Sequence, residues 1–294
     1  MFEINKLRDD ELREITLEEA IEMSKKIFEE EDKVRKEIVK RVKNSLNKNP
    51  DVEEVILFGS TARMDSTRKN DVDFLIMFKG DPEEIFEISK DVMKTNPERI
   101  IHLTFISKSD LEEALSDGKE PYKMFRFERY NPLYKKVPID GVNRLGKVEL
   151  VHNGKLRVWT INNFNSAGLA NTLVFSGLME PEGWSKRMLG YYALPFFDEK
   201  VNPKIHSMIY LNPRLMYDGL LKVSRNKILF DEGVVYNGNL IDLIDSMDGI
   251  SEDLVARILY LRVNERHVPK KDIRLIKGEY IRTCHDIVNG SKPF

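Results

Sequence analysis

The stretches VILFGSTAR at residues 55–63 and DVDFLIMF at residues 71–78 decide the fold of this 294-residue chain. The first stretch predicts an apolar strand followed by a Gly-Ser turn that opens a short helix, and the second predicts a strand carrying two carboxylates. Side chains alternate along a strand, so Asp71 and Asp73 point to the same face of the expected sheet. Two aligned carboxylates suit Mg²⁺, which proteins hold with one or two carboxylates plus substrate phosphates.

The pair Gly59-Ser60 predicts an anion-binding turn beside these carboxylates. Small residues let the backbone approach a ligand closely, and a helix that begins there directs its N–H groups and its positive dipole end at an anion. A turn that binds phosphate next to a metal-binding strand indicates a metal-bound nucleoside triphosphate as the ligand.

In this order and spacing, the motif resembles the nucleotidyltransferase superfamily related to DNA polymerase β, and within it the minimal nucleotidyltransferases. The family pattern is an apolar residue, Gly, Gly or Ser, a spacer of roughly a dozen residues, and Asp-x-Asp flanked by apolar positions. The chain has FGS at 58–60, the spacer 61–70 and DVDF at 71–74, and GSTAR at 59–63 matches the Gly-Ser-x-Ala-Arg of minimal members. The resemblance covers roughly residues 15–136 and none of the remainder.

The resemblance implies a role for each motif residue. Gly59 and Ser60 correspond to the triphosphate-binding turn, and Arg63 is placed to contact the triphosphate as a positive partner. Asp71 and Asp73 correspond to the catalytic metal ligands. The implied reaction is attack by a hydroxyl of an RNA, a protein or a small molecule on the α-phosphorus of a nucleoside triphosphate such as ATP, with release of pyrophosphate. Mg²⁺, with Mn²⁺ as an alternative, would stabilise the attacking and leaving oxygens.

One departure from the family pattern concerns the third carboxylate that active members usually carry on a neighbouring strand. The next expected strand, RIIHLTFI at 99–106, has no acidic residue, and His102 or Thr104 occupies that kind of position. Histidine can bind a metal or accept a proton, although a lone histidine on an apolar strand is more often structural. The carboxylates that would substitute, none of which the sequence assigns, are Glu98, Asp110, Asp140 and Glu149. A catalytically inactive nucleotide-binding module and an antitoxin-like protein-interaction module therefore stand as alternatives to an enzyme.

Alternating helices and strands predict a mixed α/β (α+β) first domain over residues 1–137, with a small mixed β-sheet and flanking helices like a polymerase β palm. Thr16 and Glu19 form a capping box at the start of a helix that ends near residues 47–50. The apolar positions of that helix are Ile21, Ile27, Val34, Ile38, Val42 and Leu46. The aromatic-rich segment at 125–134 resembles the closing strand of the minimal nucleotidyltransferases.

Residues 138–294 predict a second α+β domain that carries no recognised motif and is helical from about residue 240. The segment 147–160 predicts a hairpin that turns through Asn153-Gly154, and short strands are expected at 227–230 and 233–236. The helical section is interrupted at 248–249 and at Pro269. Over the last part of the chain, eight basic residues stand against four acidic ones, which fits either an RNA- or acidic-protein-binding face or, as we favour, a solvated face with charge pairs.

Composition bounds the remaining possibilities. Apolar residues make up 41% of the chain, charged residues 33%, and the net charge is -2, so binding of nucleic acid would need a local basic patch. Cys284 is the single cysteine, which excludes an internal disulfide framework and fits a reducing compartment. Without an apolar run of about 18 residues or a signal-like N-terminus, the sequence predicts a cytoplasmic protein with no membrane partner. It does not encode a recognisable oligomeric state, nucleobase preference or acceptor.

Overall fold

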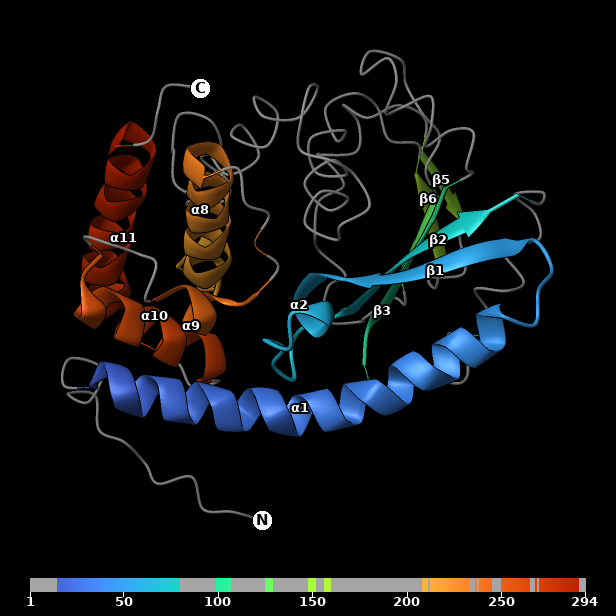
Figure 1. Cartoon of the computed structure of the whole chain (residues 1–294), viewed down its shortest axis with the longest axis horizontal. Helices are drawn as coiled ribbons and strands as arrows, with labels where there is room; N and C mark the ends of the chain where they lie inside the picture. The colour runs from blue at the N-terminus through green and yellow to red at the C-terminus, as the bar shows by residue number, and fades with distance from the viewer. Residues whose placement is uncertain are drawn as a thin grey trace. The chain divides into compact units, whose positions relative to one another are not determined.

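The chain divides into two compact units, one made of Glu29–Met179 and the other of Met1–Phe28 together with Glu180–Phe294. The computed structural model describes residues 15–79, 92, 99–106, 125–128, 148–151, 156–159, 208–210, 212–232, 236, 238–244, 250–264, 268 and 270–290 (Figure 1). The domain boundary expected at 137 stays a prediction, because the residues around it lie outside these ranges. The helices expected at 81, 109 and 163–179 lie there as well, apart from Val92, which is helical.

The unit Glu29–Met179 is built on a small mixed sheet. Its strands are β1 (Val52–Phe58), β2 (Val72–Phe78), β3 (Ile101–Ile106) and β4 (Phe125–Glu128), in the spatial order β1-β2-β3-β4. Strand β2 is antiparallel to β1 and parallel to β3, and β4 is antiparallel to β3. The predicted mixed sheet is confirmed. A second antiparallel pair, β5 (Val148–Val151) and β6 (Leu156–Trp159), confirms the hairpin expected around Asn-Gly.

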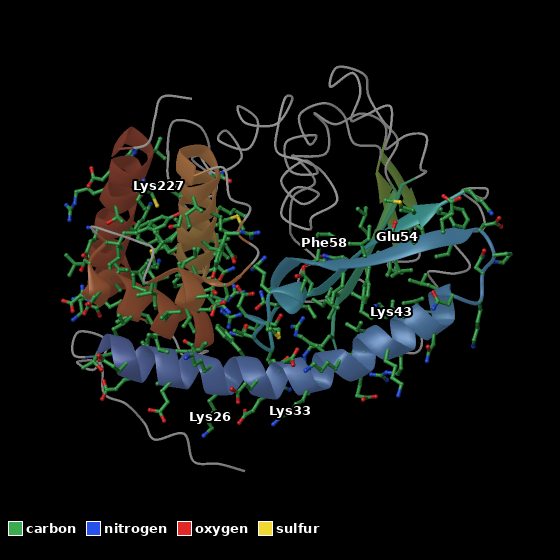
Figure 2. The ribbon with its side chains drawn as sticks, viewed as in Figure 1. Lys26, Lys33, Lys43, Glu54, Phe58 and Lys227 are labelled. Atoms are coloured by element: carbon green, nitrogen blue, oxygen red, sulfur yellow. The ribbon has the colours of Figure 1, made fainter. Side chains whose placement is uncertain are left out.

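Helix α1 (Leu17–Leu46) covers one face of the four-stranded sheet with the part that belongs to this unit (Figure 1). Its residues Ile38, Val42 and Leu46 are fully buried, whereas Lys33 lies on the exposed side of the helix (Figure 2). The three buried residues of α1 pack against the apolar side chains of β2 and β3, namely Val72, Phe74, Ile76, Phe78, Ile101, Leu103 and Phe105. Because β2 turns its even-numbered residues toward α1, its odd-numbered residues occupy the opposite face.

The predicted capping box at the start of α1 is confirmed. The Thr16 backbone N–H donates to Glu19 Oε2 at 3.0 Å, and the Glu19 N–H donates to Thr16 Oγ1 at 3.3 Å. The expected apolar stripe is right at its C-terminal end but wrong at Val34, which is 40% exposed. The inward positions there are taken by Glu31 and Arg35 instead, both buried. A polar pair therefore interrupts the apolar stripe where α1 reaches the sheet.

The other unit is helical in its described part, with α8 (Leu215–Glu232), α9 (Leu240–Leu243), α10 (Glu252–Val263) and α11 (Lys270–Gly290). Asn239 caps α9 with a capping box and Ser251 caps α10, so each helix begins where a side-chain oxygen accepts an otherwise unpaired N–H. The expected helical C-terminal section is confirmed, and its two predicted breaks fall between helices. None of the described helices has an apolar stretch long enough to cross a membrane.

The strand expected at residues 227–230 is wrong, because this segment is the last part of α8. Helical structure is therefore already present at Leu215, before the expected start near residue 240. The buried positions Tyr217, Leu221, Ser224 and Ile228 follow helical spacing. A short apolar run such as KILF has no periodicity of its own, so it does not distinguish a strand from the end of a buried helix. Of the second expected strand, 233–236, only Tyr236 is described, and it belongs to no strand.

Several basic residues of the C-terminal section have partners within their own unit. Arg262 is buried, with its Nη1 at 3.3 Å from Asp218 Oδ1 and its guanidinium 4.6 Å from the centroid of the Tyr217 ring. Arg257 pairs with Asp253 and Glu279, and the Lys277 ammonium lies 4.6 Å from the centroid of the Tyr210 ring. These contacts support charge pairing for Arg257 and Arg262, and packing on an aromatic ring for Lys277, rather than phosphate binding.

Candidate metal and nucleotide site

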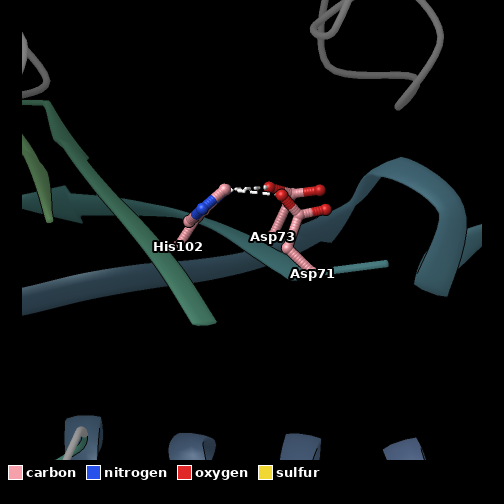
Figure 3. Close-up of side chains that lie close together, drawn as sticks. All are labelled: Asp71, Asp73 and His102. Carbon is pink, nitrogen blue, oxygen red and sulfur yellow. Dashed lines mark hydrogen bonds and ion pairs between the residues drawn. The ribbon is translucent and has the colours of Figure 1, made fainter. Parts of the chain in front are cut away.

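Two carboxylates and an imidazole converge at the start of the parallel strands β2 and β3. His102 is the Cα partner of Asp73 across the β2–β3 pair, and Asp71 directly precedes β2. His102 Nδ1 lies 2.9 Å from Asp71 Oδ2 and 3.1 Å from Asp73 Oδ1 (Figure 3). The structure thus brings together the two predicted acids, with His102 at the neighbouring-strand position where the family pattern expects a third carboxylate.

The three side chains can hold a cation. One ligand atom from each lies within 4.8 Å of the other two. Exposure of the side chains falls from 36% for Asp71 to 15% for Asp73 and 12% for His102, so the site opens to solvent on the Asp71 side. Two negative charges held this close beside an imidazole create a local preference for a cation.

Gly59 fits against Asp73 in a way that no other residue allows. It follows β1 directly and has φ +72, a left-handed conformation that glycine adopts without steric cost. A Cβ at this position would lie 2.5 Å from Asp73 Oδ2. The helix that follows, α2 (Gly59–Ala62), is a single turn, so its dipole is weaker than a longer helix would supply. Any anion binding by this turn therefore depends on its individual N–H groups and side chains.

Hydroxyl groups fix the turn between α2 and β2. Ser66 Oγ donates to Ser60 Oγ at 3.0 Å, and Thr61 Oγ1 lies 3.4 Å from the Ser66 hydroxyl. Because Ser66 is the donor, the Ser60 hydroxyl keeps its own proton for another acceptor. Arg63, the predicted triphosphate contact, instead places its Nε 3.1 Å from the buried Asp65 Oδ2. Its guanidinium would have to extend from this pair to meet a phosphate.

Arg35 of α1 holds the loop that leads into β2. Its Nη1 donates to the Asp71 carbonyl at 2.6 Å and to Thr61 Oγ1 at 2.7 Å. Its Nη2 donates to the carbonyls of Asn70 at 2.7 Å and Thr67 at 2.9 Å. Burial lowers the pKa of Arg35, while nearby Glu31 acts in the opposite direction. The planar guanidinium of Arg35 thus fixes the backbone of Asp71, the first candidate metal ligand, from the face of the sheet that α1 covers.

Glu31 extends this network to β3. It lies 3.5 Å from Arg35 Nε and receives two hydrogen bonds from Arg99, one from Nε at 3.1 Å and one from Nη2 at 2.6 Å. Arg99 stands three residues before His102, just outside β3. One buried carboxylate on α1 therefore connects the segments that deliver Asp71 and His102. Such a fork-to-fork Arg–carboxylate pair adds geometric specificity to charge attraction.

The sequence did not identify a third carboxylate, and the structure does not describe the side chain of any of the four candidates. Glu98, Asp110 and Asp140 lie outside the described residues, and Glu149 is in β5, where only the backbone is described. Backbone pairing makes Glu128 of β4 the Cα partner of His102. Sequence reasoning missed Arg35 and Glu31, which hold the loop and the strand that carry the site. The charged pair at i, i+4 on an apolar stripe was the one signal that could have revealed the two residues on α1.

The turn predicts a specific effect of adding one methyl group. Gly59→Ala should destabilise the unit by at least about 1 kcal/mol from the left-handed φ alone, and it should displace Asp73 and weaken divalent-metal binding. The matched control is Gly278→Ala on α11, where a Cβ would meet nothing within 4 Å. Removing a helical glycine there should stabilise the protein by about 0.5–1 kcal/mol. Urea denaturation followed by circular dichroism measures the free energy of unfolding of both variants. Equal changes in the two would contradict the conclusion that Gly59 is required by its left-handed conformation and its contact with Asp73.

The Arg35 network predicts that its loss is costly for stability. Arg35→Met should lower the free energy of unfolding by about 3–5 kcal/mol, because Glu31 and three loop carbonyls lose a buried partner. Lys36→Met removes the neighbouring exposed Lys36–Asp32 pair, whose Nζ–Oδ2 distance is 2.6 Å, and should change stability by less than about 1 kcal/mol. Arg35→Lys should lie between the two variants. A fully stable Arg35→Met protein would show that the loop is held by other contacts.

Part of this chain matches a known protein family. Residues 40–120 match the family model described as polymerase beta, nucleotidyltransferase. No curated protein matches the sequence. Among solved structures, the spectinomycin adenyltransferase of Enterococcus faecialis, crystallised with ATP and spectinomycin, is 15% identical, with a TM-score of 0.49 over 85% of this chain and 98% of that chain. The matched residues contain α2, β2, β3 and every member of the Asp-Asp-His group. Residues 40–120 therefore lie in a polymerase β-like nucleotidyltransferase domain.

Proposed function

We propose that this protein transfers a nucleoside monophosphate from a nucleoside triphosphate to an acceptor hydroxyl in a divalent-metal-dependent reaction that releases pyrophosphate. The observation that carries the proposal is the convergence of Asp71, Asp73 and His102 beside the left-handed Gly59 turn. Two carboxylates held this close on a partly exposed sheet end repel each other unless a positive partner lies beside them, and a merely structural sheet has no need for such a pair. Acids beside a glycine turn are suited to binding a nucleotide together with its cation.

The donor set fits a divalent cation, because two carboxylates and an imidazole are all common metal ligands. Asp71 and Asp73 would hold Mg²⁺, or Mn²⁺ in its place. Such an ion, when bound, polarises phosphoryl oxygens and stabilises the charge that develops on the attacking and leaving oxygens. The remaining requirements fall on the chain itself, which must bind the triphosphate and orient it in line with the acceptor.

The Gly59-Ser60 turn would bind the triphosphate. Without a Cβ at Gly59 the backbone can approach a phosphate oxygen, and the Ser60 hydroxyl, which already accepts from Ser66, can donate to it. Arg63 would add positive charge by exchanging Asp65 for a phosphate. Asp65 is buried, so its carboxylate would lose the ion pair with Arg63, and this cost reduces the net contribution of Arg63 to triphosphate binding. We therefore assign Arg63 a smaller contribution than the turn.

The acceptor hydroxyl of an RNA, a protein or a small molecule would have to lose a proton during attack. The family pattern gives that task to a carboxylate on a strand neighbouring the Asp-x-Asp strand, where this chain has His102. Glu128 is the residue of β4 that pairs with His102 in the β3–β4 register, so it is an acidic position on the strand next to β3. We therefore include Glu128 in the experimental test.

A second candidate function is a nucleotide-binding module without transfer activity, such as an antitoxin-like partner that acts by protein contact. It is favoured by one observation, the imidazole in place of the third acid. Such a module would keep metal and nucleotide binding, because these depend on Asp71, Asp73 and the Gly59 turn. Transfer of label separates the two functions, since binding alone leaves the acceptor unlabelled.

The test is incubation of the purified chain with each α-³²P-labelled nucleoside triphosphate, with Mg²⁺ or Mn²⁺, and with a lysate as the source of RNA, protein and small-molecule acceptors. We expect wild-type protein to label one acceptor class, which nuclease, protease or thin-layer analysis identifies. Asp71→Asn/Asp73→Asn should abolish labelling while its circular dichroism spectrum stays that of wild type. Glu128→Gln should lower labelling without lowering nucleotide affinity if this carboxylate serves the acceptor.

Two outcomes would overturn the proposed transfer. Labelling that persists in Asp71→Asn/Asp73→Asn places the chemistry elsewhere. Absence of labelling from wild type under all nucleotides and both metals, together with nucleotide binding by calorimetry, favours the non-catalytic module. Lys36→Met, which changes an exposed pair on α1, serves as the control for nonspecific effects of substitution on labelling.

A further inference from the structure

We propose that His102 is an inner-sphere ligand of the metal and makes the site selective for Mn²⁺ over Mg²⁺. The inference rests on the proposed function for the presence of a metal at Asp71 and Asp73, and it goes beyond it by assigning both the third ligand and the ion. It makes the histidine the chemical replacement of the missing acid rather than a structural residue on an apolar strand.

The geometry fits coordination. Adjacent ligands of an octahedral ion with bonds of about 2.1 Å lie about 3.0 Å apart. His102 Nδ1 lies 2.9 Å from Asp71 Oδ2 and 3.1 Å from Asp73 Oδ1, so the nitrogen and each carboxylate oxygen already have the spacing of neighbouring ligands (Figure 3). The same nitrogen faces both acids, which is the arrangement of three ligands around one ion.

The imidazole is held in this position by the fold. Pairing of β2 with β3 sets His102 opposite Asp73, and the neighbouring residues Ile101 and Leu103 are fully buried on the other face of the sheet. The side chain of His102 is 12% exposed. The Arg99–Glu31 pair fixes the backbone just before β3. The nitrogen therefore needs little rearrangement to bind an ion, which is what preorganises a metal site.

The chemistry of the donor set selects the ion. Mg²⁺ binds almost entirely through oxygen and dehydrates reluctantly, so replacing a carboxylate by an imidazole removes both a charge and a preferred ligand. First-row ions accept imidazole readily, and Mn²⁺ also accepts the carboxylate and phosphate oxygens that nucleotide transfer requires. Between these two ions, an Asp-Asp-His site next to a triphosphate therefore favours Mn²⁺, whereas three acids would shift the preference toward Mg²⁺.

The direct test is pulsed electron paramagnetic resonance of Mn²⁺ bound to the full chain without nucleotide, with protein in excess over metal. We expect a hyperfine coupling to ¹⁴N that becomes a ¹⁵N coupling when the protein is labelled with ¹⁵N-histidine. His102→Ala should abolish the coupling. His285→Ala, which alters a histidine of α11 in the other unit, should leave it unchanged.

A competition experiment supplies a second readout that does not depend on activity. The concentration of Mg²⁺ that displaces half of the bound Mn²⁺ is measured for wild type and for His102→Asp. Restoring a third carboxylate should shift the preference toward Mg²⁺ by about tenfold, the lower end of what changes near a metal site produce. Circular dichroism of both His102 variants establishes that they are folded.

The outcomes separate this inference from the proposed function. Mn²⁺ that is lost in Asp71→Asn/Asp73→Asn but shows no histidine nitrogen coupling in wild type overturns the ligand assignment and leaves nucleotide transfer intact. A nitrogen coupling in a protein that labels no acceptor supports the metal site and removes the transfer activity. Failure of Mn²⁺ to bind at the two acids overturns the ligand assignment and the selectivity, whereas the labelling experiment alone decides on transfer. An unchanged Mg²⁺ preference in His102→Asp contradicts the proposed selectivity.

Discussion

The site depends on one buried guanidinium. Arg35 lies on the inward stripe of α1, and its four hydrogen bonds reach the Thr61 side chain and the carbonyls of the loop that ends at Asp71. Burial of a charge is expensive unless its donors are satisfied. Here Nη1 and Nη2 donate to three backbone carbonyls and the Thr61 hydroxyl, whereas Nε has only the Glu31 carboxylate at 3.5 Å. Glu31 offsets the charge and passes the constraint to Arg99 at the start of β3. The helix therefore positions the site through polar contacts as well as through its apolar core.

With the loop fixed in this way, the sheet completes the arrangement. The antiparallel partner Phe58 brings Gly59 to Asp73, and the parallel partner His102 approaches the same carboxylate from the other strand. The resulting group has two acids, one imidazole and a backbone turn that no side chain can fill. These are the elements that a nucleotidyltransferase domain needs for a cation and a triphosphate, and the imidazole in place of a third acid is the basis for the proposed preference for Mn²⁺.

Much of this fold is predictable from the sequence, because local signals agreed with it. The Gly-Ser turn, the alternating Asp71 and Asp73, the Thr16 capping box and the Asn-Gly hairpin are short-range patterns with few structural solutions. The apolar run at 227–230 failed because its length allows a helix end as well as a strand, and only burial in the helical core decides between them. Arg35 was not predicted because its four partners are 26–36 residues away in the chain. The position of His102 beside both acids likewise depends on strand pairing rather than on local sequence.

The central claim is that the acids, the histidine and the Gly59 turn form one site for a metal-bound triphosphate. It is tested most directly by anomalous diffraction at the manganese edge, on crystals grown with Mn²⁺ and a non-hydrolysable α,β-methylene analogue of ATP. We expect an anomalous peak bonded to Asp71, Asp73 and His102 Nδ1, with phosphate oxygens against Gly59 and Ser60. A nucleotide bound elsewhere, or a manganese peak away from the two acids, would contradict it.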